Sequence, residues 1–259
     1  MSIVKGIALI TGSAQGIGRS IALRLARDGF DIALNDVSSK RDQLCAVADE
    51  IDKIGRRTLL VPADVTVEEE VKGMVQDVSE HLGGLDVMVA NAGVAKLSSL
   101  VSTRLEDWDR IMAVNARGPF LCYKYAAQQM IKQGRGGRII GASSVLGRSA
   151  LPLCAPYAAS KFAIRGLTQS AALELGKYKI TVNAYAPGII KTPMVETLPA
   201  VAEADMEMFN ITMGRLSMKA IEAESQPEDI ASIVSYLVSK EAHFITGQCI
   251  TVDGGIVPS

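Results

Sequence analysis

Three side chains in the second half of the chain have the types and spacing needed for acid–base chemistry. Ser144 is followed by Tyr157 and then by Lys161, four residues further on. Residues at i and i+4 share one face of a helix. An ammonium about 4 Å from a phenol contributes on the order of 4 kcal/mol, or roughly three pK units, against an ordinary tyrosine pKa of about 10. We therefore predict that Tyr157 titrates near neutral pH as a general acid or base, while Ser144 binds the substrate oxygen.

A second group of residues, near the N-terminus, is suited to binding phosphate. The stretch TGSAQGIG (11–18) follows the apolar run GIALIT (6–11) and precedes a helical pattern at 19–29. Gly12 allows a tight turn, Gly16 a close approach of a pyrophosphate, and Gly18 close packing of the helix on the strand. The helix N-terminus supplies free N–H groups to the phosphates. A strand-to-helix corner that merely needs small residues is the alternative interpretation of this stretch alone.

Asp36 favours the nucleotide interpretation and indicates which nucleotide is bound. It ends a predicted strand at 31–36 and lies 18 residues after Gly18. A carboxylate at this position accepts hydrogen bonds from ribose hydroxyls and repels the extra phosphate of NADP, so NAD is predicted over NADP. Lys40 and Arg41 bring positive charge nearby and weaken that preference.

Short apolar runs alternate with longer helical patterns along the whole chain, so the elements that position these residues can be predicted. The spacing indicates strands at 6–11, 31–36, 58–65, 85–93, 138–144, 180–188 and 248–255, and helices at 19–29, 40–54, 67–82, 103–133, 154–176 and 227–239. This alternation predicts an α/β fold: a Rossmann-type, doubly wound parallel sheet of about seven strands with helices on both faces. Residues 1–259 are predicted to form a single domain.

Composition narrows the range of partners. Lys and Arg number 27 against 28 Asp and Glu, and basic residues are not clustered, which argues against nucleic-acid binding. The four cysteines and two histidines lie far apart, so no metal site is predicted. The N-terminus lacks a signal-peptide pattern, and no apolar run reaches the roughly 18 residues of a membrane span. We expect a cytoplasmic protein that acts on a small molecule.

These residues together resemble the short-chain dehydrogenase/reductase family over nearly the whole chain. The family's TGxxxGIG turn is Thr11 to Gly18, its acidic pair is Asp64-Val65, and its NNAG motif becomes Ala90-Asn91-Ala92-Gly93. The resemblance implies secondary alcohol and ketone interconversion, with Asn115 anchoring a proton-relay water and Lys161 also holding the nicotinamide ribose. The residues that it implies for cofactor binding are Gly12, Gln15, Gly16, Ile17, Gly18, Asp36, Asp64, Val65, Asn91, Gly93, Tyr157, Lys161, Pro187, Gly188, Ile190 and Thr192.

Within the family the chain is similar to acetoin/diacetyl reductases (2,3-butanediol dehydrogenases), but two stretches differ from them. The loop VLGRSALPLCAP after Ser144 is apolar where those enzymes carry polar groups, so Val145, Leu151, Leu153 and Met194 are predicted to line a hydrophobic substrate pocket. Packing within the loop is the alternative for the leucines. The segment MKAIEAES (218–225) is an insertion relative to those enzymes, and residues 194–226, rich in methionine, are predicted to form a mobile substrate lid.

Three further functions stay open at this point. The chain could be an acetoin/diacetyl reductase after all, an NADP-linked acyl-chain ketoreductase, or a nucleotide-binding sensor or scaffold without turnover. The resemblance also implies a homotetramer, with a dimer as the alternative. An apolar outer face on the helices at 103–133 and 155–176 would make the contact, and its expected residues are Phe120, Tyr123, Ala127, Phe162, Leu167 and Ala171.

Overall fold

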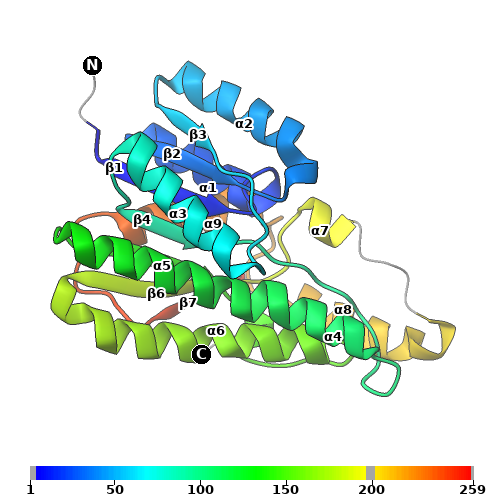
Figure 1. Cartoon of the computed structure of the whole chain (residues 1–259). Helices are drawn as coiled ribbons and strands as arrows, with labels where there is room; N and C mark the ends of the chain where they lie inside the picture. The colour runs from blue at the N-terminus through cyan, green and yellow to red at the C-terminus, as the bar shows by residue number, and fades with distance from the viewer. Residues whose placement is uncertain (1–3, 197–201, 258–259) are drawn as a thin grey trace.

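A seven-stranded parallel sheet forms the centre of the molecule (Figure 1). The computed structural model describes residues 4–196 and 202–257. The strand order is β3-β2-β1-β4-β5-β6-β7, with the change of direction between β1 and β4. The strands are β1 (Gly6–Thr11), β2 (Phe30–Asn35), β3 (Thr58–Leu60), β4 (Val87–Ala90), β5 (Gly137–Ala142), β6 (Ile180–Pro187) and β7 (Cys249–Val252). The predicted fold class is therefore confirmed.

Helices cover both faces of this sheet. On one face pack α1 (Gly16–Asp28), α2 (Arg41–Ile54) and α9 (Pro227–Val238). On the other pack α3 (Glu68–Leu82), α5 (Gly118–Gln133) and α6 (Ala155–Leu175). The remaining described α-helices are α4 (Leu105–Met112), α7 (Pro193–Glu196) and α8 (Met206–Ser217). Since both faces are covered, all residues of β2 and β6 are buried, including the polar Asp31, Asn35 and Asn183.

The helical region predicted at 103–133 is divided into two helices by a wider turn. Between α4 and α5, residues Ala113–Arg117 form a π-helical turn. Asn115 lies in this turn and is fully buried, and its side chain bonds to the main chain of Val94. Turns of this kind often occur at functional sites. The hydrophobic spacing did not reveal the turn because apolar residues continue on both sides of it.

Part of the expected oligomer face is buried within the single chain. Tyr123 and Ala127 point into the core, and the Tyr123 hydroxyl lies 3.1 Å from Thr168 Oγ1 between α5 and α6. The prediction that these two side chains face outward is therefore wrong, since both pack on the sheet side of α5. Phe120 and Phe162 are exposed, at 48% and 43%.

The region 194–226 contains α7, a single helical turn at Glu203–Asp205, and α8. Residues 197–201 of the predicted lid lie outside the described residues. The segment 218–225 follows α8 and is attached to the C-terminal loop, where the Gly254 carbonyl accepts hydrogen bonds from Ala220 N (2.8 Å) and Ile221 N (3.0 Å). Among the described residues, no helix has the length and apolar character needed to cross a membrane.

Candidate active site

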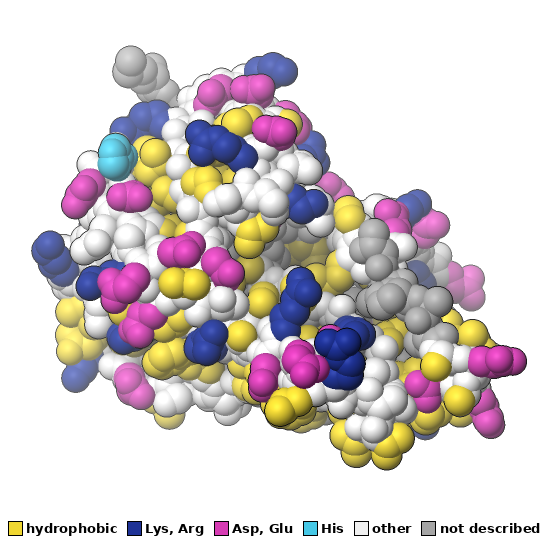
Figure 2. Space-filling model, turned by 45° about the vertical axis from the view of Figure 1, so that its right-hand side comes forward, with side chains coloured by type: hydrophobic (Ala, Val, Ile, Leu, Met, Phe, Trp, Pro, Cys, Tyr) yellow, Lys and Arg dark blue, Asp and Glu magenta, His cyan; other side chains and the backbone are white. Residues whose placement is uncertain are grey.

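Two adjoining cavities open where the strands end. The larger, of about 590 Å³, runs along the carboxyl ends of β1, β2, β4, β5 and β6. The smaller, of about 120 Å³, lies beneath α8 and has a mostly apolar lining. Ser144, Tyr157, Gly188, Met194 and Val195 line both. Figure 2 shows this face of the molecule hollowed, with Lys and Arg side chains at the rim.

The turn between β1 and α1 has the shape that a phosphate group requires. Gly12 and Gly16 have φ values of +64° and +56°, which favour glycine. A Cβ on Gly18 would overlap the Gly12 carbonyl oxygen, so the helix can approach the turn only with glycine at this position. Gly18 therefore shapes the cavity without lining it. This cradle fits a dinucleotide pyrophosphate at the start of α1.

Asn91 fixes this turn to the end of β4. Its Nδ2 donates to the carbonyls of Thr11 (2.8 Å) and Gly12 (3.1 Å), and its Oδ1 accepts from the Tyr185 hydroxyl (2.8 Å). The hydrogen bonds of its side chain therefore connect the ends of β1, β4 and β6. Ala90 is buried in β4, and the neighbouring Asn91 makes these contacts without a second asparagine.

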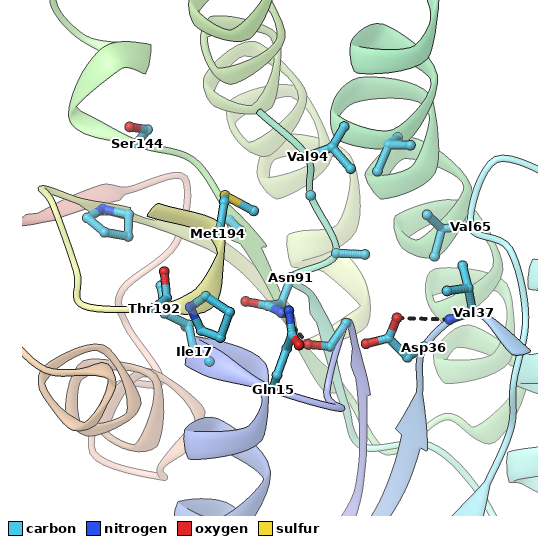
Figure 3. Close-up of a pocket in the computed structure, with 18 of the residues that line it drawn as sticks. Gln15, Ile17, Asp36, Val37, Val65, Asn91, Val94, Ser144, Thr192 and Met194 are labelled. Carbon is cyan, nitrogen blue, oxygen red and sulfur yellow. Dashed lines mark hydrogen bonds between the residues drawn. The ribbon is translucent and has the colours of Figure 1, made fainter. Parts of the chain in front are cut away.

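Asp36 lies at the opposite end of the larger cavity from Ser144 (Figure 3). Its carboxylate accepts from Ala14 N (3.2 Å) and Val37 N (2.9 Å), which holds it in place at the cavity wall. Lys40 lines the same end, with its Nζ 3.5 Å from Gln15 Oε1. The end therefore presents both a carboxylate and an ammonium to a nucleotide ribose.

Ser144, Tyr157 and Lys161 meet at the junction of the two cavities. Ser144 caps the one-turn helix Val145–Gly147, and its Oγ accepts from Leu146 N at 3.1 Å, while its hydroxyl also forms a hydrogen bond with Tyr157. Lys161 Nζ donates to the Ala142 carbonyl (2.8 Å) and lies 5.5 Å from the centre of the Tyr157 ring. The i, i+4 spacing on α6 thus brings the ammonium to the phenol, as predicted.

Burial sets the protonation of this pair. It raises the pKa of the Tyr157 phenol to about 12, against a smaller lowering by its hydrogen bond with Ser144. It also lowers the pKa of Lys161 to about 8. In the chain alone, the pKa of Tyr157 therefore lies above the near-neutral range that the attraction of the ammonium predicts, because desolvation acts in the opposite direction. Tyr157 keeps its proton at neutral pH and can donate it.

Asn115 lies behind this group and outside the cavity lining. Its Oδ1 accepts from Val94 N (2.8 Å), and its Nδ2 donates to the Val94 carbonyl (2.9 Å) and to Ser160 Oγ (3.2 Å). A Cβ on Gly93 would lie 3.4 Å from Asn115 Oδ1 and 3.7 Å from Lys161 Nζ. Asn115 therefore fixes the wall opposite Lys161, and the absence of a side chain at Gly93 leaves that wall open.

The loop after β6 closes the cavities from the other side. Pro187, Gly188, Ile190 and Thr192 all line the larger one. Ser225, at the end of the 218–225 segment, holds this loop: its Oγ donates to the Ile189 carbonyl (2.5 Å) and its carbonyl accepts from Lys191 N (3.3 Å). The 218–225 segment therefore connects the loop to the C-terminal segment through hydrogen bonds near both of its ends.

Some of the predicted pocket residues line the smaller cavity, and others do not. Val145 and Met194 line it, together with Leu146, Cys154 and the α8 residues Met213 and Leu216. Leu151 and Leu153 line neither cavity. Leu151 packs against the cluster around Val145, and Leu153 is buried with φ +63° while its carbonyl accepts from Ser98 N (3.0 Å). These two leucines pack the loop, which is the alternative stated for them above.

The structure brings most of the remaining sequence-predicted residues into the larger cavity. They are Gly12, Gln15, Gly16, Ile17, Asp36, Asp64, Val65, Asn91, Gly93, Ser144, Tyr157, Lys161, Pro187, Gly188, Ile190, Thr192 and Met194. Sequence reasoning missed Arg110, which lines this cavity from the last turn of α4, and Lys96, which lines the smaller one. Neither belongs to a motif, and only the folded positions of α4 and the 94–104 loop identify them.

The chain is similar to known proteins over nearly its whole length. Residues 12–257 match the family model described as enoyl-(acyl carrier protein) reductase. The chain is 53% identical to a short-chain dehydrogenase/reductase of Armillaria gallica, over 97% of this chain and 95% of the relative. It is 38% identical to the L-2,3-butanediol dehydrogenase of Corynebacterium glutamicum, over 97% and 98%.

A solved structure gives the same result. A short-chain dehydrogenase from Burkholderia cenocepacia in complex with NADP superposes with a TM-score of 0.85 at 36% identity, covering 96% of each chain. The predicted likeness to butanediol dehydrogenases is confirmed by the Corynebacterium relative. Sequence, fold and site geometry agree, and the chain belongs to the short-chain dehydrogenase/reductase family of oxidoreductases.

Proposed function

We propose that this protein is an NAD-dependent oxidoreductase that interconverts a hydrophobic secondary alcohol and its ketone, with Tyr157 as the general acid and base. The observation that carries the proposal is the position of Ser144 and Tyr157, which line both the larger, nucleotide-sized cavity and the smaller apolar one. A reacting carbon at their junction reaches the cofactor from one side and the acid from the other.

The residues divide the chemistry among themselves. A bound nicotinamide dinucleotide supplies hydride transfer to or from the substrate carbon. In the reducing direction, the Tyr157 O–H donates its proton to the substrate oxygen, and the Ser144 O–H hydrogen-bonds the same oxygen. Lys161 stabilises the phenolate left on Tyr157 through its positive charge, since its Nζ lies close to the ring. Oxidation reverses each step.

Asp36 supports NAD as the cofactor. Its carboxylate is held by two main-chain N–H groups at the end of the larger cavity, where it would accept hydrogen bonds from the ribose hydroxyls and repel a 2′-phosphate. Lys40 lies on the same wall, and its positive charge would attract the 2′-phosphate of NADP. NADP is therefore the weaker alternative, and we expect a preference for NAD that is smaller than an isolated carboxylate would give.

Initial rates with NAD and NADP, across substrates from acetoin to bulky cyclic alcohols, test cofactor and substrate together. We expect higher kcat/KM with NAD and with the bulky alcohols, because the lining of the smaller cavity is mainly apolar. Equal or better efficiency on acetoin would favour the second candidate, an acetoin/butanediol dehydrogenase, which the Corynebacterium relative supports.

Replacing Tyr157 with Phe distinguishes an enzyme from a nucleotide-binding scaffold. We expect Tyr157→Phe to lower kcat about 10²- to 10⁴-fold, the usual contribution of a positioned acid or base. The dissociation constant for NAD, measured by calorimetry, should stay within a few-fold of the wild-type value. Tyr178→Phe is the matched control because this exposed tyrosine lies in the single helical turn that follows α6, well separated from Tyr157 in the sequence. Near-normal turnover in Tyr157→Phe would remove Tyr157 from the mechanism.

A further inference from the structure

Lys96 brings a charge to the otherwise uncharged lining of the smaller cavity. Among the described lining residues it is the only side chain with a formal charge, and the others are mainly apolar side chains contributed by the loop after Ser144 and by α8. The remaining polar side chains are already engaged. Ser144 and Tyr157 bind the reacting oxygen in the proposed mechanism, and Thr212 Oγ1 donates to the Pro152 carbonyl (3.1 Å).

The ammonium is held in place by an acidic partner on α4. Lys96 Nζ lies 2.6 Å from Asp107 Oδ2, and the Asp107 side chain is only 19% exposed. The hydrogen bond from Lys96 holds the pKa of Asp107 below its ordinary value, so this carboxylate stays ionised. An ammonium has three N–H donors, and this contact uses one of them. The other two donors make no hydrogen bond to the described residues, and the Lys96 side chain is 40% exposed.

The charge balance around Lys96 decides which ligand group suits those donors. Asp107 neutralises the ammonium directly, and Arg104 approaches the same Asp107 oxygen at 3.7 Å while bonding Glu106 at 3.2 Å. A carboxylate on the ligand would lose its hydration in an apolar cavity and meet an ammonium that is already paired. A neutral oxygen loses less on burial and still accepts a hydrogen bond from the charged donor.

We propose that Lys96 is a specificity-determining residue and that the substrate is a hydrophobic ketone or alcohol carrying a second, neutral oxygen, a hydroxyl or carbonyl, which accepts a hydrogen bond from Lys96. This inference rests on the proposed function and adds the substrate's second functional group to it. The reacting oxygen is bound by Ser144 and Tyr157 and the second by the 94–97 loop, so the two oxygens fix the orientation of an apolar skeleton between them.

The test uses a series of bicyclic ketones with ten ring carbons: the parent decalone, a hydroxydecalone and a carboxydecalone. We expect the wild-type protein to prefer the hydroxy compound over the parent, in kcat/KM, by about 10- to 100-fold, the worth of a hydrogen bond to a charged group. Lys96→Met keeps the length and apolar stem of the side chain and removes only the donors. In this variant the preference should fall to within about twofold.

Arg104→Met is the matched control. Arg104 is a cation beside the same Asp107 but does not line either cavity, so its loss should leave the preference unchanged. Asp107→Asn should move selectivity toward the carboxy compound, because the ammonium is then no longer neutralised. An unchanged preference in Lys96→Met would show that Lys96 lines the cavity only with its stem, and would overturn the proposal.

Binding separates failure of this inference from failure of the proposed function. Dissociation constants of the parent and hydroxy ketones for the NAD-loaded protein, by calorimetry, do not depend on turnover. Loss of the binding preference in Lys96→Met supports the inference even if no ketone is reduced, whereas turnover of all three ketones with no role for Lys96 refutes the inference alone. If the wild-type protein preferred the carboxy compound and Lys96→Met lost that preference, the group bound by Lys96 would be a carboxylate. The proposal of a neutral oxygen would then be overturned.

Discussion

At the residue scale, the reacting end of the cavity depends on two side chains that burial affects in opposite senses. Burial favours the neutral form of each, so it raises the pKa of Tyr157 and lowers that of Lys161. The phenol consequently keeps its proton at neutral pH, and the ammonium is easily deprotonated. The pair thus favours reduction at neutral pH, since Tyr157 is protonated and Lys161 is charged on the acid side of about pH 8.

The pH dependence of reduction follows from the lowered pKa of Lys161. As pH rises through about 8, Lys161 loses the positive charge that stabilises the Tyr157 phenolate. We expect kcat/KM for ketone reduction to be level below this pH and to decline above it. Lys161→Met should lower kcat/KM in the pH-independent range and remove the inflection near pH 8. Initial rates between pH 6 and 10 measure both effects. An inflection that persists in Lys161→Met would have to be assigned to another group.

At the scale of the elements, the turn that opens α1 shows how closely helix and strand must approach. Gly18→Ala would place a methyl group against the Gly12 carbonyl, which must then shift. We expect a loss of about 1–3 kcal/mol in the free energy of unfolding, and a higher dissociation constant for NAD. Gly73→Ala in α3 is the control, because open space surrounds that position, and it should stabilise by about 0.5–1 kcal/mol. Chemical denaturation and calorimetry measure both quantities.

A second element, the 218–225 segment, should affect substrate binding through the loop after β6, to which it is hydrogen-bonded. Ser225→Ala removes the hydrogen bond to the Ile189 carbonyl, and a bond of this kind contributes about 0.5–1.5 kcal/mol. We expect KM values to rise several-fold with little change in kcat, because the Gly188–Thr192 loop lines the cavities without taking a proton. Ser225→Thr keeps a hydroxyl and should restore KM. Ser217→Ala, which removes an exposed bond to Met213, serves as the comparison. A fall in kcat alone would argue against a positioning role.

The elements also show what the sequence can and cannot predict. The apolar runs predicted the seven strands because buried parallel strands need continuous hydrophobic residues, and the glycine and Ser–Tyr–Lys spacings placed most cavity residues. The π-helical turn at Asn115 and the positive φ of Leu153 have no periodic signature. The pKa of Tyr157 depends on burial, and Lys96 reaches its cavity through the packing of a loop on α4; both are properties of the folded chain.

At the scale of the whole molecule, an apolar surface on α5 and α6 is left uncovered by the chain itself. Phe120 and Phe162 are exposed although Tyr123 and Ala127, on the same helix as Phe120, are in the core. Exposed aromatic side chains on adjacent helices are typical of an interface between copies. We therefore expect subunits to meet across these two helices, in the homotetramer that the family resemblance implies or, as the alternative, in a dimer.

Replacing Phe162 with Asp tests this assembly. Light scattering should give the wild-type protein a mass four times that of the 27.5 kDa chain, and Phe162→Asp a smaller species, because a carboxylate buried in an apolar interface is costly. Val101→Asp, at an equally apolar but loop-borne and almost fully exposed position, should leave the mass unchanged. Since α6 also carries Tyr157 and Lys161, loss of the contact should lower activity and thermal stability together. A monomeric wild-type protein, or an unchanged mass for Phe162→Asp, would exclude this face as the interface.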